Sequence, residues 1–426
     1  MVKRFKAMRG THDILPGEAS RWRRVEQAFA DVCNRYGYLE IRTPIFEATE
    51  VFERGTGFST DVVQKEMYTF EDKKGRRISL RPEATPSVIR AYLEHNLDKR
   101  GKVLKVFYMG PMFRYDRPGA GRYRQFHQLG IEIIGTPSAV ADAEAIVLLW
   151  DFLTNLGLGG LRVRVNSLGC EKCRVEYSRL VKSFLAERLD DLCQDCHERF
   201  ERNPLRVLDC KQKKCKVVIA EAPEIGSILC QDCREHLDRV KQLIEVGGVD
   251  FYIDPKLVRG LDYYTRTVFE VFHEASGVDN SLGGGGRYDR LVEDLGGAST
   301  PAVGFSAGME RILQALDADG VKLEGDQPVE IFIAPMGSQA FEQAFELARD
   351  LRHTYHVWLE FDDRKIDRQL RTASRLGVRF AIIIGSEEIS KGTVKIKDMT
   401  KGEQYEVERS AVLAWLEKHR EGSDFE

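Results

Sequence analysis

The segment from Phe107 to Gly135 constrains the fold of this chain more than any other part of the sequence. It is typical of two strands joined by a loop, Tyr115–Gly121, whose Asp, Pro and Gly residues supply turn chemistry. Along the second strand Leu129, Ile131 and Ile133 alternate with other side chains, so these three residues point into a core. The opposite face is too polar to be buried and too ordered for an idle solvent surface, so we expect it to meet a ligand.

That opposite face carries an aromatic plate at Phe126 and an acid at Glu132, with Gln128 between them. Four arginines crowd the loop and its flanks: Arg114, Arg117, Arg122 and Arg124. Like charges this close are held most easily around a polyanion. A polar strand face with a basic rim suits a zwitterion bound beside a nucleotide triphosphate. An ordinary hairpin with a solvated basic loop would have the same composition.

The rest of the chain limits the classes of protein to consider. Its 426 residues are enough for two or three domains, and the formal net charge of −3 means that any nucleic-acid partner would be met by local patches. The basic start is not followed by the apolar run of a secretory signal, and no segment approaches the roughly 20 apolar residues of a membrane helix. We therefore expect a soluble, cytoplasmic protein that does not bind membranes.

Eight of the nine cysteines are clustered in one region, while Cys33 stands alone. The eight form the pairs Cys170/Cys173, Cys193/Cys196, Cys210/Cys215 and Cys230/Cys233. Three of these pairs have the CxxC spacing with which two thiolates grip one tetrahedral zinc ion, so one or two structural Zn²⁺ sites are possible, with a pairing that spacing does not give. Disulfides are the alternative, and they are the weaker one for a chain without an export signal.

Two further segments place polar groups beside strands. Glu83 and Thr85 follow a hairpin strand and precede a helix that Pro86 can begin, which is a frequent position for ligand contacts. The alternative is structural: Thr85 would cap the helix, and Glu83 would interact favourably with the positive end of the helix dipole. Four consecutive glycines within Ser281–Arg287 indicate that another backbone or a ligand comes very close.

The pattern changes after a linker-like Asp326–Pro328. Beyond it, strands expected at Val329–Ala334 and Phe380–Ile384 alternate with helices, which predicts a mixed α/β domain over residues 328–420. Residues 1–325 are expected to form an α+β domain built on an antiparallel sheet. The cysteine-rich, partly helical segment 168–250 interrupts it as an insertion.

Several ordered stretches carry a resemblance to a known family. They are RGTHD at Arg9–Asp13, LRPE at Leu80–Glu83, the arginine-led hairpin Phe113–Phe126, RGLDYY at Arg259–Tyr264, GRYD at Gly286–Asp289 and GMER at Gly308–Arg311. Together they resemble the histidyl-tRNA synthetases, a family of class II aminoacyl-tRNA synthetases, over essentially the full length. The eight clustered cysteines are not general to that family.

The resemblance implies a class II catalytic domain, a C-terminal anticodon-binding domain and a homodimer. It implies that ATP, with Mg²⁺, and L-histidine give histidyl-adenylate and pyrophosphate, and that histidine then passes to the 3′ end of histidine tRNA. One alternative is the regulatory subunit of ATP phosphoribosyltransferase, a histidine-sensing paralogue that generally lacks the last domain and key arginines. Another is a tRNA-binding or histidine-sensing module without catalysis.

The resemblance also assigns residues to histidine: Glu83, Ala84, Thr85, Arg114, Gln128, Glu132, Arg259, Tyr263 and Tyr264. Glu83 and Thr85 would hold the α-amino group, and Glu132 and Tyr264 would contact the imidazole. Bacterial members often have Gly where Ala84 stands, and the added methyl group should be tolerated.

The residues that the resemblance assigns to ATP are Arg114, Arg122, Phe126 and Arg311. Arg114 and Arg259 would act as the catalytic cations at the α-phosphate, where they offset the repulsion between two anions and stabilise the spreading charge. Phe126 would stack on adenine, while Arg122 and Arg311 would take the outer phosphates. Arg311 stands in the first turn of a helix, against the dipole, which is more often a structural position.

Two expectations concern tRNA. Arg364, Arg368, Arg371 and Arg375 recur at helical spacing and form one stripe, which would contact anticodon-stem phosphates or, equally well, be a solvated face offset by nearby aspartates. Removal of zinc from the insertion should weaken tRNA charging and leave adenylate formation intact.

Overall fold

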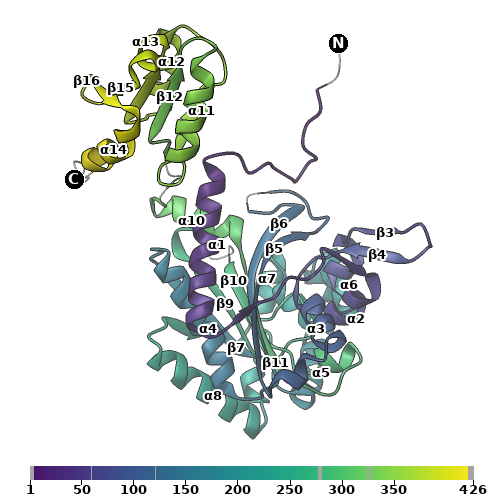
Figure 1. Ribbon diagram of the computed structural model, residues 1–426. Helices are drawn as coiled ribbons and strands as arrows, with labels where there is room; N and C mark the ends of the chain where they lie inside the picture. The colour runs from purple at the N-terminus through teal and green to yellow at the C-terminus, as the bar shows by residue number, and fades with distance from the viewer. Residues whose placement is uncertain are drawn as a thin grey trace. The chain divides into compact units, whose positions relative to one another are not determined.

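The computed structural model describes residues 4–420 except 59, 120, 277–280, 324, 326 and 327, and it describes only the backbone at 100, 276 and 420. The chain divides into two compact units, Met1–Glu324 and Gly325–Glu426 (Figure 1). Residues 326 and 327, at which the sequence predicts a linker, lie outside the described residues. No helix among the described residues is both long and apolar enough to cross a membrane.

An eight-stranded sheet organises the first unit. Its strands, in order across the sheet, are β1 (Leu39–Glu40), β5 (Leu104–Phe113), β6 (Gln125–Ile134), β11 (Ala302–Gly308), β10 (Ser281–Arg287), β9 (Thr265–His273), β7 (Leu161–Ser167) and β8 (Phe251–Ile253). All inner pairs are antiparallel, and only the edge pairs β1–β5 and β7–β8 are parallel. The predicted α+β class with an antiparallel sheet is confirmed.

The hairpin that the alternation predicts is formed by β5 and β6. Phe107 lies opposite Ile131, and Gly110 lies opposite Gln128 in its register. Leu129, Ile131 and Ile133 are buried in the main core, as predicted. The alternation therefore assigns the core-facing side of β6 correctly.

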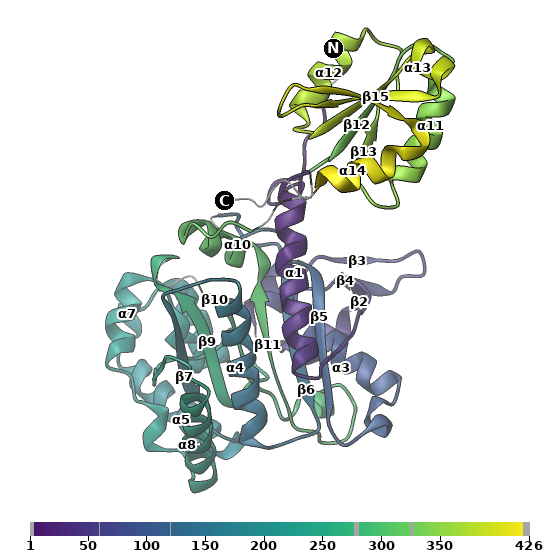
Figure 2. The ribbon, with the colours of Figure 1, turned by 60° about the vertical axis from the view of Figure 1, so that its left-hand side comes forward.

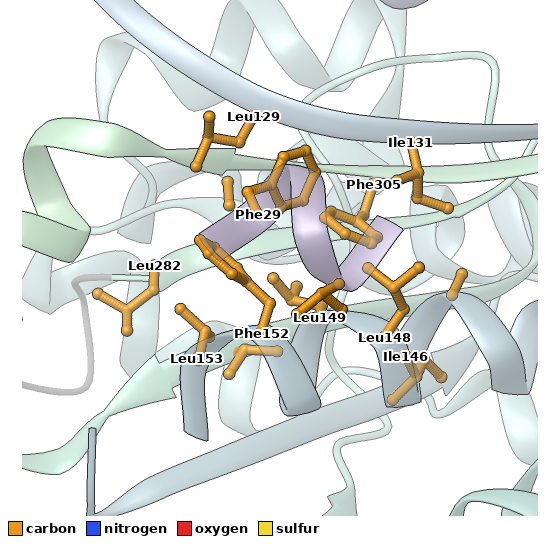
Figure 3. Packing of buried hydrophobic residues seen from close by; sticks show 14 of the residues in the cluster. Phe29, Leu129, Ile131, Ile146, Leu148, Leu149, Phe152, Leu153, Leu282 and Phe305 are labelled. Atoms are coloured by element: carbon orange, nitrogen blue, oxygen red, sulfur yellow. The ribbon is translucent and has the colours of Figure 1, made fainter. Parts of the chain in front are cut away.

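Three helices, α1 (Glu18–Arg35), α4 (Ala139–Asn155) and α8 (Gln231–Val246), lie on the apolar face of this sheet (Figures 1 and 2). Phe29 of α1 is wholly buried, and its ring centroid lies 5.0 Å from that of Phe152 and 6.0 Å from that of Phe107. Figure 3 shows Phe29 of α1 and Phe152 of α4 packed together with Phe305 of strand β11. Burying aromatic side chains of this size is the main stabilising contribution to such a core.

The remaining elements of the first unit surround the sheet. The helices are α2 (Thr49–Thr56), α3 (Thr85–Glu94), α5 (Glu171–Ala186), α6 (Gln194–Arg202), α7 (Lys213–Ala220), α9 (Leu291–Asp294) and α10 (Met309–Ala318). A small antiparallel sheet holds β2 (Phe46–Ala48), β4 (Arg77–Leu80) and β3 (Thr69–Glu71) in the order β2–β4–β3. Val88, Ile89 and Tyr92 of α3 pack against the second face of the large sheet, near Val106 and Tyr108.

Helices α5 to α8 form the insertion, which has a hydrophobic core of its own. Cys233, near the start of α8, belongs to that core, whereas Val240 and Ile244 of the same helix belong to the main core. Helix α8 therefore connects the insertion to the large sheet.

The second unit is a five-stranded mixed sheet between helices. Its strands are β12 (Ile331–Pro335), β13 (Val357–Leu359), β14 (Phe380–Ile384), β15 (Thr393–Asp398) and β16 (Gln404–Glu408), and its helices are α11 (Ala340–Leu351), α12 (Ile366–Arg375), α13 (Ser386–Lys391) and α14 (Val412–Arg420). Strand β12 pairs in parallel with β13 and β14, while β15 and β16 are antiparallel. Helices α11 and α14 cover one face and α12 the other, which is the predicted mixed α/β arrangement.

Candidate active site

A cleft of about 620 Å³ lies over the polar face of the large sheet in the first unit. Eight of the twelve side chains that the resemblance assigns to histidine and ATP line it: Glu83, Arg114, Arg122, Phe126, Gln128, Arg259, Tyr264 and Arg311. The other four, Ala84, Thr85, Glu132 and Tyr263, are buried. All twelve are therefore brought to the same region by segments far apart in the sequence.

Glu83 lies at the end of the β4 segment, just before helix α3. Its carboxylate accepts hydrogen bonds from Thr56 Oγ1 at 2.6 Å and from the Tyr263 hydroxyl at 2.9 Å. Burial raises the pKa of Glu83, although these two donors and Arg114 oppose the shift. The carboxylate is therefore poised to gain a cationic partner, which would relieve the cost of its burial.

Glu132 is buried deeper than the sequence predicted. We expected its face of β6 to be too polar for burial, and this is wrong at Glu132, which is only 1% exposed. Its carboxylate accepts hydrogen bonds from Thr85 Oγ1 at 2.7 Å and from the Tyr288 hydroxyl, so both oxygens are satisfied. Burial raises the pKa of Glu132 to about 8 against the effect of these donors. An acid at this position can accept a further donor or exchange a proton near neutral pH.

The four arginines that the resemblance assigns to the substrates line the cleft, and each has a partner in the protein. Arg259 pairs with Glu270, and Arg122 lies 3.3 Å from Asp116. Arg311 Nη1 donates to the Ser281 carbonyl at 2.7 Å.

Arg114 Nε donates to the Pro82 carbonyl at 2.9 Å, and its guanidinium carbon lies 5.4 Å from the centre of the Phe126 ring. Burial and the nearby Arg122 lower the pKa of Arg311. The contribution of Arg122 is a repulsion between like charges, which an anion bound between the two arginines would relieve.

The four glycines of β10 allow the close approach that the sequence predicted. A side chain at Gly284 would meet Arg259 Nη1 at 2.8 Å and the Phe269 carbonyl at 2.6 Å. On the neighbouring strand β11, a side chain at Gly304 would meet the Glu132 carboxylate. Small residues here let a buried acid and an arginine lie directly on the sheet.

Sequence reasoning missed several residues of this site. Thr56 ends helix α2, and no local pattern marks it. Tyr288 lies in a motif that we quoted without giving the residue a role. Glu270 had a usable signal, because it is a lone carboxylate among apolar residues of β9, as Glu132 is on β6. The wall that the insertion adds to the cleft, including Arg199 and Arg206, was also missed.

The structure pairs the eight clustered cysteines. The proximal cluster is Cys170, Cys173, Cys230 and Cys233, and the distal cluster is Cys193, Cys196, Cys210 and Cys215. In each cluster the four sulfur atoms lie within 4.8 Å of one another, so each is able to hold a metal ion. All eight are free thiols, so the disulfide alternative is wrong for this structure.

The arginine stripe of the second unit lies on and just before helix α12. Arg364, Arg368, Arg371 and Arg375 are all exposed. Arg364 forms an ion pair of 2.6 Å with Asp362, so at least part of the stripe is offset by acid, as the alternative interpretation expected.

The antiparallel sheet, with arginines over a polar cleft and a separate mixed α/β unit after it, is the architecture of a class II aminoacyl-tRNA synthetase. Residues 10–312 match the family model of histidyl-tRNA synthetase, and residues 330–419 match that of an anticodon-binding domain. The chain belongs to the histidyl-tRNA synthetase family.

Individual relatives agree with this assignment. The chain is 46% identical over 409 residues to the histidine–tRNA ligase of Pelotomaculum thermopropionicum, which covers 96% of both chains. The solved structure of apo histidyl-tRNA synthetase from S. aureus is 36% identical, has a TM-score of 0.81 and matches 97% of this chain and 99% of that one. A solved Bacillus halodurans protein described as an ATP phosphoribosyltransferase regulatory subunit/histidyl-tRNA synthetase is 22% identical with a TM-score of 0.66, over 91% of this chain and all of that one, and shares the fold.

Proposed function

We propose that this protein is a histidine–tRNA ligase. It activates L-histidine with ATP to form histidyl-adenylate and pyrophosphate, and it then transfers histidine to the 3′ end of its tRNA. The observation that carries this proposal is the cleft itself, where two buried carboxylates and a basic rim meet on one sheet. Because charged tRNA is used in protein synthesis, we expect the protein to act in the cytoplasm.

In the first step a carboxylate oxygen of histidine attacks the α-phosphorus of ATP. The new bond joins that oxygen to phosphorus, and the bond to the bridging oxygen breaks so that pyrophosphate leaves with its magnesium. Arg114 and Arg259 supply the positive charge that the two approaching anions need. Little covalent chemistry is asked of the protein, so its main contribution is to position the two substrates.

In the second step a hydroxyl at the 3′ end of the tRNA attacks the carbonyl carbon of the adenylate, and AMP leaves. Phe126 stacks on adenine in both steps, whereas Arg122 and Arg311 hold the outer phosphates of ATP during the first step, before pyrophosphate leaves. For Arg122 this requires release from Asp116, because the two now form an ion pair.

Histidine is selected by polar groups at both of its ends. Glu83 and Thr85 hold the α-ammonium group, Gln128 contacts the substrate, and Glu132 and Tyr264 serve the imidazole. A pocket that must satisfy both imidazole nitrogens rejects apolar amino acids by about 10⁴-fold or more, because its buried polar groups are otherwise left unpaired. Tyr263 holds Glu83 in place.

The histidine-sensing paralogue is the weaker alternative. The arginines that it generally loses, Arg114, Arg259 and Arg311, are present here, and so is the C-terminal domain. The 46% identity to a histidine–tRNA ligase also favours the enzyme over the sensor.

Glu132→Ala is expected to weaken histidine binding much more than ATP binding, because only histidine brings a donor to this acid. Calorimetric titrations with each ligand alone measure the two affinities, and Glu132→Gln is the matched variant that keeps the size of the side chain. An equal loss for both ligands would mean that Glu132 only holds Thr85 and Tyr288 in place.

We propose that the arginine stripe binds tRNA phosphates. Reversal of Arg368 and Arg371 to Glu should weaken tRNA binding and reduce the slope of log affinity against log salt by about 1–2, since each phosphate contact contributes about 0.7–0.9. The control reverses Arg349 and Arg352, which are exposed at the end of helix α11 in the same unit. Salt slopes that stay equal to the wild-type value would remove the stripe from the interface.

We also propose a homodimer. Strand β1 lies at an edge of the large sheet, and the Leu39 side chain on it is 68% exposed. Phe46, on the edge strand β2 of the small sheet, is 54% exposed. An exposed edge strand with apolar side chains favours pairing with a second chain. Sedimentation equilibrium is expected to give twice the chain mass of 48.6 kDa, and the mass of one chain would contradict this proposal.

The proposal includes structural zinc in the insertion, because four thiolates are the donor set of many structural zinc sites.

Charging of tRNA tests the function as a whole. We expect the protein to attach labelled histidine to total tRNA in the presence of Mg²⁺ and ATP. Attachment of a different amino acid would overturn the assigned substrate.

A further inference from the structure

The sulfur atoms of both cysteine clusters are spaced as they would be around a tetrahedral ion. Cys170 Sγ lies 3.7 Å from Cys173 Sγ and 4.0 Å from Cys230 Sγ in the proximal cluster. Cys193 Sγ lies 3.8 Å from Cys210 Sγ in the distal cluster. Zinc–sulfur bonds of about 2.3 Å place the corners of a tetrahedron about 3.8 Å apart, whereas a disulfide requires about 2.05 Å.

The backbone around the clusters favours thiolates over thiols. Cys170, Cys193 and Cys230 each stand at the N-cap of a helix, respectively α5, α6 and α8, where the helix dipole favours negative charge. Backbone N–H groups also point at sulfur, since Cys193 N donates to Cys215 Sγ at 3.2 Å and Cys230 N donates to Cys173 Sγ at 3.2 Å. Each cluster therefore combines metal-like spacing with helix ends and backbone N–H groups that would stabilise thiolate ligands of a bound cation.

The distal cluster is part of the cleft. Its ligand Cys210 lines the cleft, and so do residues between and beside its cysteines, which we call the cleft wall: Asp195, Arg199, Arg206, Asp209, Lys211 and Gln212. Asp195 lies between two ligands, and Lys211 and Gln212 lie between the other two. The position of these side chains is thus set by the four sulfur atoms.

The cleft wall faces the catalytic sheet with positive charge. Arg199 and Arg206 both pair with Asp61, at 2.8 and 3.1 Å. Arg199 Nε and Arg206 Nη1 are buried with no hydrogen-bond partner among the described residues. Arg199, Arg206 and Lys211 all line the cleft, so the wall presents three cationic side chains to an anion bound there.

We propose that the distal cluster binds a zinc ion whose task is to hold the cleft wall against the nucleotide, so that amino-acid activation itself depends on this metal. This inference rests on the proposed function and changes the expectation from the sequence, which placed the effect of metal loss on tRNA charging alone. The proximal cluster binds a second zinc ion at the joint between the insertion and the sheet, where α5 and α8 begin. Zinc supplies no chemical step here, and its contribution is the folding energy of the wall.

The first test compares two double variants with the wild type. Wild-type protein should contain about two zinc equivalents, while Cys210→Ser/Cys215→Ser and the matched control Cys230→Ser/Cys233→Ser should each contain about one. Trypsin should cut at Arg206 and Lys211 in the distal variant and spare both sites in the control, because only the distal variant frees the wall. The KM for ATP in histidine-dependent pyrophosphate exchange should rise at least about 10-fold in the distal variant.

A second measurement needs no variant. A chelator added stepwise to the wild-type protein should lower pyrophosphate exchange as trypsin sensitivity at Arg206 appears, and added zinc should restore the exchange and the protection from trypsin.

Fewer than half an equivalent of zinc in anaerobically purified protein whose eight clustered cysteines are titratable thiols would overturn both sites. A distal variant that has lost one zinc yet keeps its wild-type KM would overturn the role of the wall while leaving the proposed function intact. A wild-type protein with two zinc ions and a protected wall but no exchange would instead contradict the proposed function.

Discussion

Arg259→Ala is expected to lower the rate of histidine-dependent ATP–pyrophosphate exchange by at least about 10²-fold, the range for loss of one preorganised charge stabiliser. Arg259 lines the cleft and lies directly over Gly284, so it is held at the sheet surface. Its partner Glu270 fixes the guanidinium and leaves Nε buried without a hydrogen bond among the described residues. The group is therefore positioned before the substrates arrive, and Arg114→Ala should have an effect of similar size.

The control must separate the loss of the catalytic cation from the effect of leaving Glu270 without its ion-pair partner. In Arg259→Ala the Glu270 carboxylate loses its ion-pair partner, and this loss by itself changes the charge balance of the cleft. The double variant Arg259→Ala/Glu270→Gln removes that charge and should still show the loss, whereas Arg179→Ala on the exposed face of α5 should not. Recovery of exchange in the double variant would assign Arg259 a structural role only.

Arg287→Ala is expected to destabilise the first unit by about 3–5 kcal/mol, the usual cost of removing one partner of a buried ion pair. Arg287 and Asp142 are both fully buried, and Arg287 Nε lies 3.1 Å from the Asp142 carboxylate. Arg287 also donates to the backbone carbonyls of Thr136 at 2.9 Å and Ser138 at 3.1 Å. Its loss would leave the buried Asp142 carboxylate without its arginine and the Thr136 carbonyl without this donor, while the Ser138 carbonyl would keep its hydrogen bond from Ala141 N.

The pKa of Asp142 shows that its neighbours stabilise the charged carboxylate. Burial opposes its ionisation, but His236 and Arg287 outweigh that effect and hold the pKa of Asp142 below its usual value. The shift in urea midpoint of Arg287→Ala measures the loss, and Arg287→Met/Asp142→Leu, which removes both charges, should recover most of it. A loss below about 1 kcal/mol for Arg287→Ala would contradict the account of this network.

Elements that depend on local pattern could be predicted from the sequence. The alternation at Leu129, Ile131 and Ile133 reports which side of strand β6 faces the core, and the structure agrees with it. The position of Glu83 between a strand and a helix was also visible, because Pro86 marks the helix start.

Partners that meet across the fold could not be predicted in this way. Thr56 and Tyr263 reach Glu83 from segments 27 and 180 residues away, and nothing in their local sequence marks this. The same reason explains the error at Glu132, since hydroxyl groups brought by α3 and by Tyr288 make its burial tolerable. The pairing of the cysteines and the contribution of the insertion to the cleft are likewise long-range facts.

Pyrophosphate exchange with the wild-type protein tests the central claim most directly. Labelled pyrophosphate should enter ATP only when L-histidine is present, and exchange with other amino acids should be slower by about 10⁴-fold or more. This result requires that one cleft bind histidine and ATP and join them reversibly. Folded protein that binds histidine but shows no histidine-dependent exchange would contradict the account and identify the chain as a sensor.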